Sequence, residues 1–148
     1  PLFPRAWFAF AQHSRTLYIK VKMPGVKITS RKREHDGAVY IDDYVEVLIG
    51  ALFAEEYYHL VFNPDASVYD TRGMDSSWQL RDFELQTELD AQGWTLKLAL
   101  PLAQFDFKAP VQLNLGGADQ SGAQLYNLFN PGKGNVHDRE HMRIIKFV

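Results

Sequence analysis

Short stretches in which apolar and polar residues alternate are the feature that most constrains the fold of this chain. Within Leu17–Met23, Tyr44–Ile49, Phe83–Leu89 and Trp94–Leu100, every second residue is apolar. Successive side chains of a β-strand point to opposite faces, so a period of two places the apolar side chains on one face. Each stretch is therefore predicted to be a strand with one face against a core.

Turn signals separate these stretches and complete the prediction of fold class. Asp90–Gly93 is a short loop containing glycine that joins two antiparallel strands, and Pro101 ends the second of them because it has no N–H to donate. We expect only a single helical turn, at Leu102–Phe105, and a curl of the chain at Ala51–Glu55. About ten short strands favour an all-β, antiparallel β-sandwich of the jelly-roll or immunoglobulin-like kind. The further predicted strands are Ala6–Gln12, Glu56–Asn63, Ser67–Thr71, Val111–Gly117, Ala123–Phe129 and Met142–Val148.

Length and charge limit the organisation and the partners. A chain of 148 residues suits one domain, so residues 1–148 are expected to form a single β-sandwich domain. Its 16 Lys and Arg against 18 Asp and Glu give a net charge of −2. Nucleic-acid binding needs a basic field, so a DNA or RNA partner is excluded.

The absence of cysteine excludes a disulfide scaffold and a Cys-ligated zinc site. Since the apolar runs are far shorter than the roughly 20 residues that cross a bilayer, we expect no membrane partner. The chain begins at Pro1 without a signal-peptide pattern. We interpret it as a processed or excised part of a longer protein.

Catalytic motifs are missing from the sequence. It contains no Gly-x-Ser-x-Gly elbow and no His-Glu-x-x-His pair. His137 and His141 have helical spacing, but their segment runs into a predicted strand, which disfavours a zinc pair. We therefore predict no catalytic residue and no enzyme activity.

The order of motifs along the chain resembles that of family 9 carbohydrate-binding modules and their relatives in the DOMON-like β-sandwich group. The resemblance covers roughly residues 17–147, and only the joint order and spacing of its segments make it specific. The segments that carry it are Leu17–Val21, Val39–Val47, Tyr57–Pro64, Val68–Gly73, Gly93–Leu102 and His137–Arg143.

This resemblance implies a function and a setting. Family 9 modules are non-catalytic and bind the ends of glucan or xylan chains, holding a sugar ring between two aromatic side chains. The implied ligand is a plant-type or uronate-containing polysaccharide or oligosaccharide. The implied setting is extracellular, cell-surface or periplasmic, as an accessory domain covalently linked to a catalytic domain such as a glycoside hydrolase.

Carried over onto this chain, the resemblance gives two binding positions. Tyr40 stands where the family has an aromatic residue before its Asp-Asp pair, and Glu46 closes the same motif. If Tyr44–Ile49 and Tyr57–Asn63 pair as a hairpin, one register puts Glu46 directly opposite His59. An ordinary cross-strand polar pair is the alternative interpretation.

The second stacking ring of the family is missing, because Val136 stands near its usual position. Trp78 or Tyr126 could close the sugar site from another direction, although Trp78 could equally anchor its loop to the core. Arg72 could hydrogen-bond vicinal hydroxyls or a uronate carboxylate, or pair with Asp70 or Asp75. The candidate ligand-binding residues are Tyr40, Glu46, His59, Arg72, Trp78, Tyr126 and His137.

No cofactor is required for stability at this size, but the resemblance implies a possible structural calcium ion. Asp42 and Asp43 are its candidate ligands, or they cap a turn. Two other functions stay open. One is a structural or interaction domain of the same fold without a sugar site. The other is a haem-binding electron-transfer domain, with Met23, Met74 or Met142 and a histidine as axial ligands.

Overall fold

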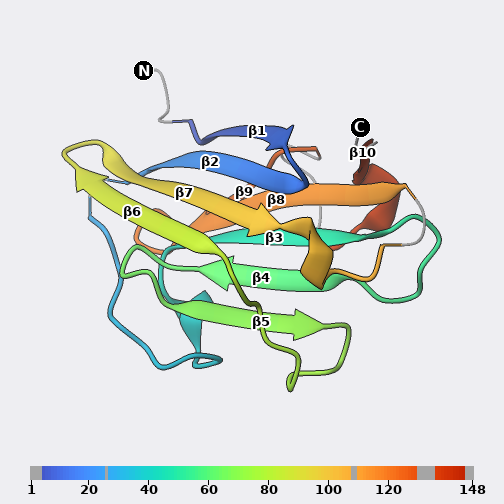
Figure 1. The fold of residues 1–148 in the computed structure, drawn as a ribbon. Coiled ribbons are helices and arrows are strands. Elements are labelled where there is room, and N and C mark those ends of the chain that lie inside the picture. The colour runs from blue at the N-terminus through green and yellow to red at the C-terminus, as the bar shows by residue number, and fades with distance from the viewer. Residues whose placement is uncertain (1–4, 26, 108–109, 130–135, 146–148) are drawn as a thin grey trace.

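Two antiparallel sheets form the two layers of a β-sandwich in the computed structural model, which describes residues 5–25, 27–107, 110–129 and 136–145 (Figure 1). The four-stranded sheet has the order β1 (Trp7–His13), β2 (Thr16–Pro24), β7 (Gly93–Pro101), β6 (Glu84–Asp90). The six-stranded sheet has the order β10 (Arg143–Ile145), β8 (Val111–Asp119), β3 (Tyr44–Ala51), β4 (Tyr58–Phe62), β5 (Val68–Arg72), and β9 (Gln124–Asn127) also pairs with β8. The predicted fold class is confirmed.

Alternating side chains of both sheets fill the space between the layers. Leu17, Ile19 and Val21 of β2 are buried there against Val45 and Val47 of β3. The sequence pattern at these strands therefore identifies the core face correctly, and burial of this apolar surface is the main stabilising contribution to the fold.

The connections match the turn signals. The β6–β7 hairpin turns between Asp90 and Gly93, and Gly93 has φ +141°, a conformation that disfavours a side chain. The predicted helical turn is confirmed as a 3₁₀ helix, η2 (Leu102–Gln104). Two further 3₁₀ turns each come shortly before a strand of the six-stranded sheet: η1 (Val39–Ile41) precedes β3, and η3 (Arg139–His141) precedes β10. None of the helices in the described part of the chain is long or apolar enough to span a membrane.

Two predicted strands are longer than the strands observed among the described residues. The last one is seen as β10, and residues 146–148 lie outside the described residues. The strand predicted at Ala123–Phe129 is the shorter β9, which within the described part of the chain pairs with β8.

Candidate functional site

The outer face of the six-stranded sheet carries a group of polar and aromatic side chains. Alternation along β3 sends Val45, Val47 and Ile49 into the core and turns Glu46 and Leu48 to the opposite face. The strand register places Glu46 in line with Gly116 of β8 on one side and with Val61 of β4 on the other. Glu46 therefore lies in the middle of the sheet, where its side chain is only 9% exposed.

Glu46 is paired with His59 of β4. The His59 Nε2 atom lies 2.9 Å from Glu46 Oε2, within hydrogen-bonding distance. The predicted register is wrong, because Leu48 stands opposite His59 and Val61 stands opposite Glu46. The two side chains still meet because they share a face and are diagonal neighbours. A buried carboxylate thus has the partner that its burial requires.

His137 reaches the same carboxylate from a distant part of the chain. Its Nε2 atom lies 4.0 Å from Glu46 Oε2, and its Nδ1 atom shares a 2.6 Å hydrogen bond with the hydroxyl of Tyr57. Burial and the neighbouring His59 lower the pKa of His137, so its ring is mainly neutral at neutral pH. Burial also raises the pKa of Tyr57, which keeps the phenol protonated.

The segment around His137 is held to the sheet by packing and by hydrogen bonds. Val136 and Met142 pack against Leu48 in a small second apolar cluster. The side-chain amide of Asn114 in β8 donates to the Val136 carbonyl at 2.8 Å. Arg139 donates to the Ala51 carbonyl at 3.1 Å. These contacts fix the ring of His137 over the sheet.

Aromatic rings continue from this cluster across the sheet to its edge. His59 and His137 lie edge to face at 4.8 Å between centroids, and His59 and Tyr69 do so at 6.2 Å. Tyr69 in turn meets Tyr40 at 5.8 Å, again edge to face. Tyr40 is 52% exposed and closes the series. We call these residues, together with Tyr57 and Glu46, the ring row.

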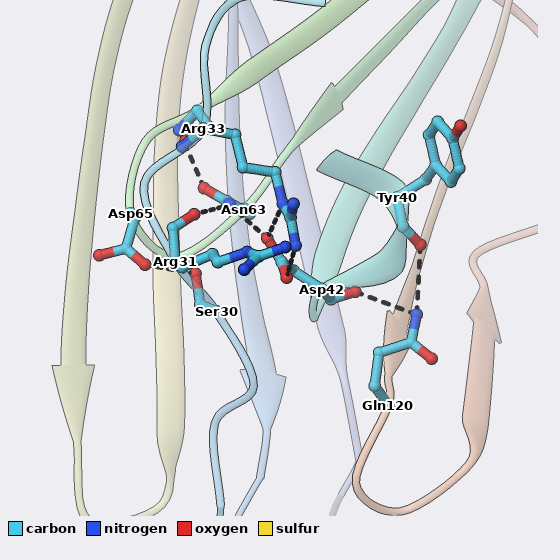
Figure 2. A network of polar contacts seen from close by, with 9 residues as sticks. Ser30, Arg31, Arg33, Tyr40, Asp42, Asn63, Asp65 and Gln120 are labelled. Atoms are coloured by element: carbon cyan, nitrogen blue, oxygen red, sulfur yellow. Dashed lines mark hydrogen bonds and ion pairs between the residues drawn. The ribbon is translucent and has the colours of Figure 1, made fainter. Parts of the chain in front are cut away.

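A polar network positions Tyr40, the middle residue of η1 (Figure 2). Arg33 donates to both carboxylate oxygens of Asp42, from Nε and Nη2, at 2.6 Å each, and Asn63 donates to the same group at 2.9 Å. Burial alone would raise the pKa of Asp42, but these donors hold that pKa below its ordinary value. Gln120 donates to the carbonyls of Tyr40 and Asp42 at 3.3 and 3.0 Å. The backbone under the exposed ring is thereby fixed.

The carboxylates of Asp42 and Asp43 do not fit a calcium site as they stand. The Asp42 carboxylate is already bound by a guanidinium and an amide (Figure 2). The Asp43 oxygens accept from the backbone N–H groups of Thr29, at 3.1 Å, and Gln120, at 2.8 Å. Calcium needs several oxygens that face the ion. The geometry therefore favours the alternative in which these residues cap the turn.

Three predicted binding residues lie outside the ring row. The guanidinium of Arg72 is 3.5 Å from Glu56 and stacks 5.8 Å over the ring of Tyr58. Of the two aspartates expected as its partners, Asp75 is bound to Arg72 through the backbone. Trp78 packs on Tyr58 at 4.7 Å, as the core-anchoring alternative expected. Tyr126 packs against the main core. The structure thus brings together Tyr40, Glu46, His59 and His137, and it separates Arg72, Trp78 and Tyr126 from them.

The methionines of the haem alternative have apolar or solvent surroundings. Met23 is part of the main core, and Met142 packs against Leu48 and Val136. Met74 is 98% exposed. The described geometry therefore does not favour a haem between the sheets.

Solved structures share this architecture. A proposed carbohydrate-binding protein from Bacteroides uniformis ATCC 8492 superposes with a TM-score of 0.70 at 13% identity, over 94% of this chain and 76% of that one. A family 9 carbohydrate-binding module from Caldicellulosiruptor kristjanssonii in complex with glucose gives 0.65 at 18% identity, over 95% and 75%. A family 9 carbohydrate-binding module from Caldicellulosiruptor kristjanssonii in complex with cellotriose gives a TM-score of 0.61 at 16% identity, over 93% of this chain and 69% of that one. This chain has the family 9 carbohydrate-binding module fold.

The likeness to family 9 modules is one of fold. No protein-family model and no curated protein sequence matches the chain. At identities of 13–18% the likeness shows the fold alone, and it assigns no binding residue.

Two residues of the ring row were not predicted as binding residues from the sequence. Tyr57 lies two positions before His59, on the same outer face, and Tyr69 stands opposite Val61 in β5. Alternation around Glu46 and His59 would have assigned both tyrosines to that face. No local pattern links either of them to His137, which lies 80 residues after Tyr57.

Proposed function

We propose that this chain is a non-catalytic carbohydrate-binding module that holds a plant-type or uronate-containing polysaccharide, or the end of its chain, on the ring row. One observation carries the proposal: the exposed ring of Tyr40 is connected, through the ring of Tyr69, to the polar cluster of Glu46, His59 and His137. The fold likeness to modules in complex with glucose and cellotriose supports the same class of ligand.

The two parts of the ring row suit the two kinds of surface on a sugar. The axial C–H groups of a pyranose form an apolar patch that packs on an aromatic face, which Tyr40 offers at 52% exposure. Its hydroxyls need donors and acceptors that are fixed in advance. The carboxylate and the two imidazoles are held by one another and by Tyr57, so little side-chain entropy is lost on binding.

The same cluster supports binding in place of glycoside hydrolysis. That reaction needs two carboxyl groups about 5–10 Å apart across the scissile bond. In the described part of the ring row, Glu46 contributes a carboxylate whose neighbours are imidazoles and phenols. We also propose that the chain lies outside the cytoplasm and is covalently linked to a glycan-processing domain. Detecting the full-length protein in the extracellular or periplasmic fraction would test the proposed location.

A second candidate is a structural or interaction domain without a sugar site. Val136, which stands where the second stacking ring is expected, is buried against Leu48 and offers no ring to a ligand. A hollow of about 350 Å³ also lies on the outer face of the opposite sheet, lined by Ala9, Ala99 and Tyr18. We favour the ring row for the sugar because its polar groups converge on one point.

Calorimetric titration separates these candidates. Tryptophan fluorescence is unsuitable, since Trp94 is buried in the core and Trp78 packs on Tyr58. The third tryptophan, Trp7, is exposed but belongs to the opposite sheet. We would titrate the protein with cello-, xylo- and uronate-containing oligosaccharides and repeat the titration with Glu46→Gln. Saturable binding that Glu46→Gln weakens is expected. The absence of binding to every oligosaccharide by a folded protein would leave the structural domain as the better interpretation.

A further inference from the structure

The cluster of one carboxylate and two imidazoles on the ring row has the composition of a metal site. Among the described residues, the ligand atoms of Glu46, His59 and His137 all lie within 4.8 Å of one another. We propose that these three residues bind a divalent transition-metal ion of the zinc class. The proposal goes beyond sugar binding, because the ion would bind whether or not a sugar is present.

The distances suit coordination of such an ion. Zinc binds imidazole nitrogen and carboxylate oxygen at about 2.0–2.2 Å, so neighbouring ligands of a tetrahedral site lie about 3.4 Å apart. The nitrogens of His59 and His137 lie 2.9 and 4.0 Å from Glu46 Oε2, one slightly closer and one slightly farther than that spacing. Shifts of about half an ångström would complete the site, with a fourth position open to water.

The surroundings of the cluster also suit a metal. Imidazoles that bind metals commonly use their second ring nitrogen in a hydrogen bond that orients the ring. His137 has such a bond, from Nδ1 to the hydroxyl of Tyr57 at 2.6 Å, which turns Nε2 toward Glu46. The imidazole side chains of His59 and His137 are 20% and 33% exposed, so an ion can enter from solvent.

A second cluster of similar spacing provides the matched control. His35, Asp36 and Asp70 also bring their ligand atoms within 4.8 Å. Their set has a single imidazole, and the Asp36 oxygens already accept from the Asp70 backbone at 3.2 Å and from Gln79 at 2.8 Å. Zinc prefers nitrogen or sulfur ligands. We therefore assign the site to the ring row.

The test titrates Zn²⁺ into the full chain, prepared without a histidine tag and stripped with a chelator. Calorimetry should give one ion per chain, and Co²⁺ should give the visible absorption of a four- or five-coordinate site. His137→Gln and Glu46→Gln should each weaken binding at least tenfold. Tyr57→Phe keeps the packing of the ring, and loss of its hydroxyl should weaken binding by about 10- to 100-fold. His35→Gln should change nothing.

Two results would overturn the proposal. One is that the folded wild-type chain binds no ion. The other is that His35→Gln abolishes binding while His137→Gln and Tyr57→Phe retain it. Circular dichroism of each variant establishes that it is folded. Since no sugar is present, failure here leaves the sugar-binding proposal untouched, and failure of every oligosaccharide titration leaves the metal site untouched.

Discussion

Removing the ring of Tyr40 should weaken sugar binding about tenfold without unfolding the protein. The side chain is 52% exposed, which for a tyrosine is roughly 100 Å² of surface. A pyranose that packs on one face would cover about half of it. At about 25 cal/mol per Å², that contact contributes about 1.3 kcal/mol, or about tenfold in Kd.

Calorimetric titration of Tyr40→Ala with the best-binding oligosaccharide would measure this loss. Tyr40→Phe keeps the flat ring and should bind within about twofold of the wild type. Tyr18→Ala is the matched control, because Tyr18 is a tyrosine of similar exposure, 45%, on the outer face of the opposite sheet. An unchanged Kd in Tyr40→Ala together with a weakened Kd in Tyr18→Ala would refute the placement of the sugar.

Three further predictions concern the support of the site and the fold. A Cβ at Gly116 would lie 2.8 Å from Val136 Cγ2 and 3.2 Å from Glu46 Oε1. Gly116→Ala should therefore displace these side chains and weaken oligosaccharide binding in the same titration. Unaltered affinity would mean that the displacement of Val136 and Glu46 does not affect the site. Gly93→Ala adds a side chain at φ +141° and should lower stability by about 1–3 kcal/mol in urea unfolding, whereas an unchanged midpoint would contradict that strain. The folded-state pKa of Asp42 lies below its ordinary value of 3.8, so its stabilisation is present above that pH and is lost as the pH falls through the folded-state pKa. Urea unfolding between about pH 2 and 6 should therefore show a shallower acid dependence in Asp42→Asn than in the wild type, and equal slopes would argue against the effect.

The fold could be predicted because its signal is periodic. Alternation in Leu17–Met23 and Trp94–Leu100 depends only on which face of a strand is buried, and these segments are the paired strands β2 and β7. Burial acts on every second residue of such a strand, so errors at one position are averaged out.

The site could be predicted only where it follows the same periodicity. Glu46 and His59 share the outer face, and their predicted contact is present. The predicted strand register is wrong, because Glu46 stands opposite Val61 and is only a diagonal neighbour of His59. Register depends on the turn and on packing across the whole sheet, which one hairpin sequence does not determine. The turn at Ala51–Glu55 has no alternating pattern, so the sequence does not predict its geometry or the register that it sets.

Contacts made by residues outside the strands could not be predicted from the sequence. The sequence predicts that Asp42 is a calcium ligand or a turn cap, whereas its partner Arg33 lies in an irregular segment without a periodic pattern. His137 meets Tyr57 across 80 residues of chain. Such contacts depend on where residues 136–145 lie against the sheet, and local spacing contains no information about that placement.

Mapping of the sugar by NMR tests the proposed site most directly. The backbone amide and imidazole resonances of the ¹⁵N-labelled chain would be followed while the best-binding oligosaccharide is added. We predict that the saturating shifts are centred on Tyr40, Glu46, His59, Tyr69 and His137. Shifts centred instead on Ala9, Tyr18 and Ala99 of the opposite sheet would contradict the assignment of sugar binding to the ring row.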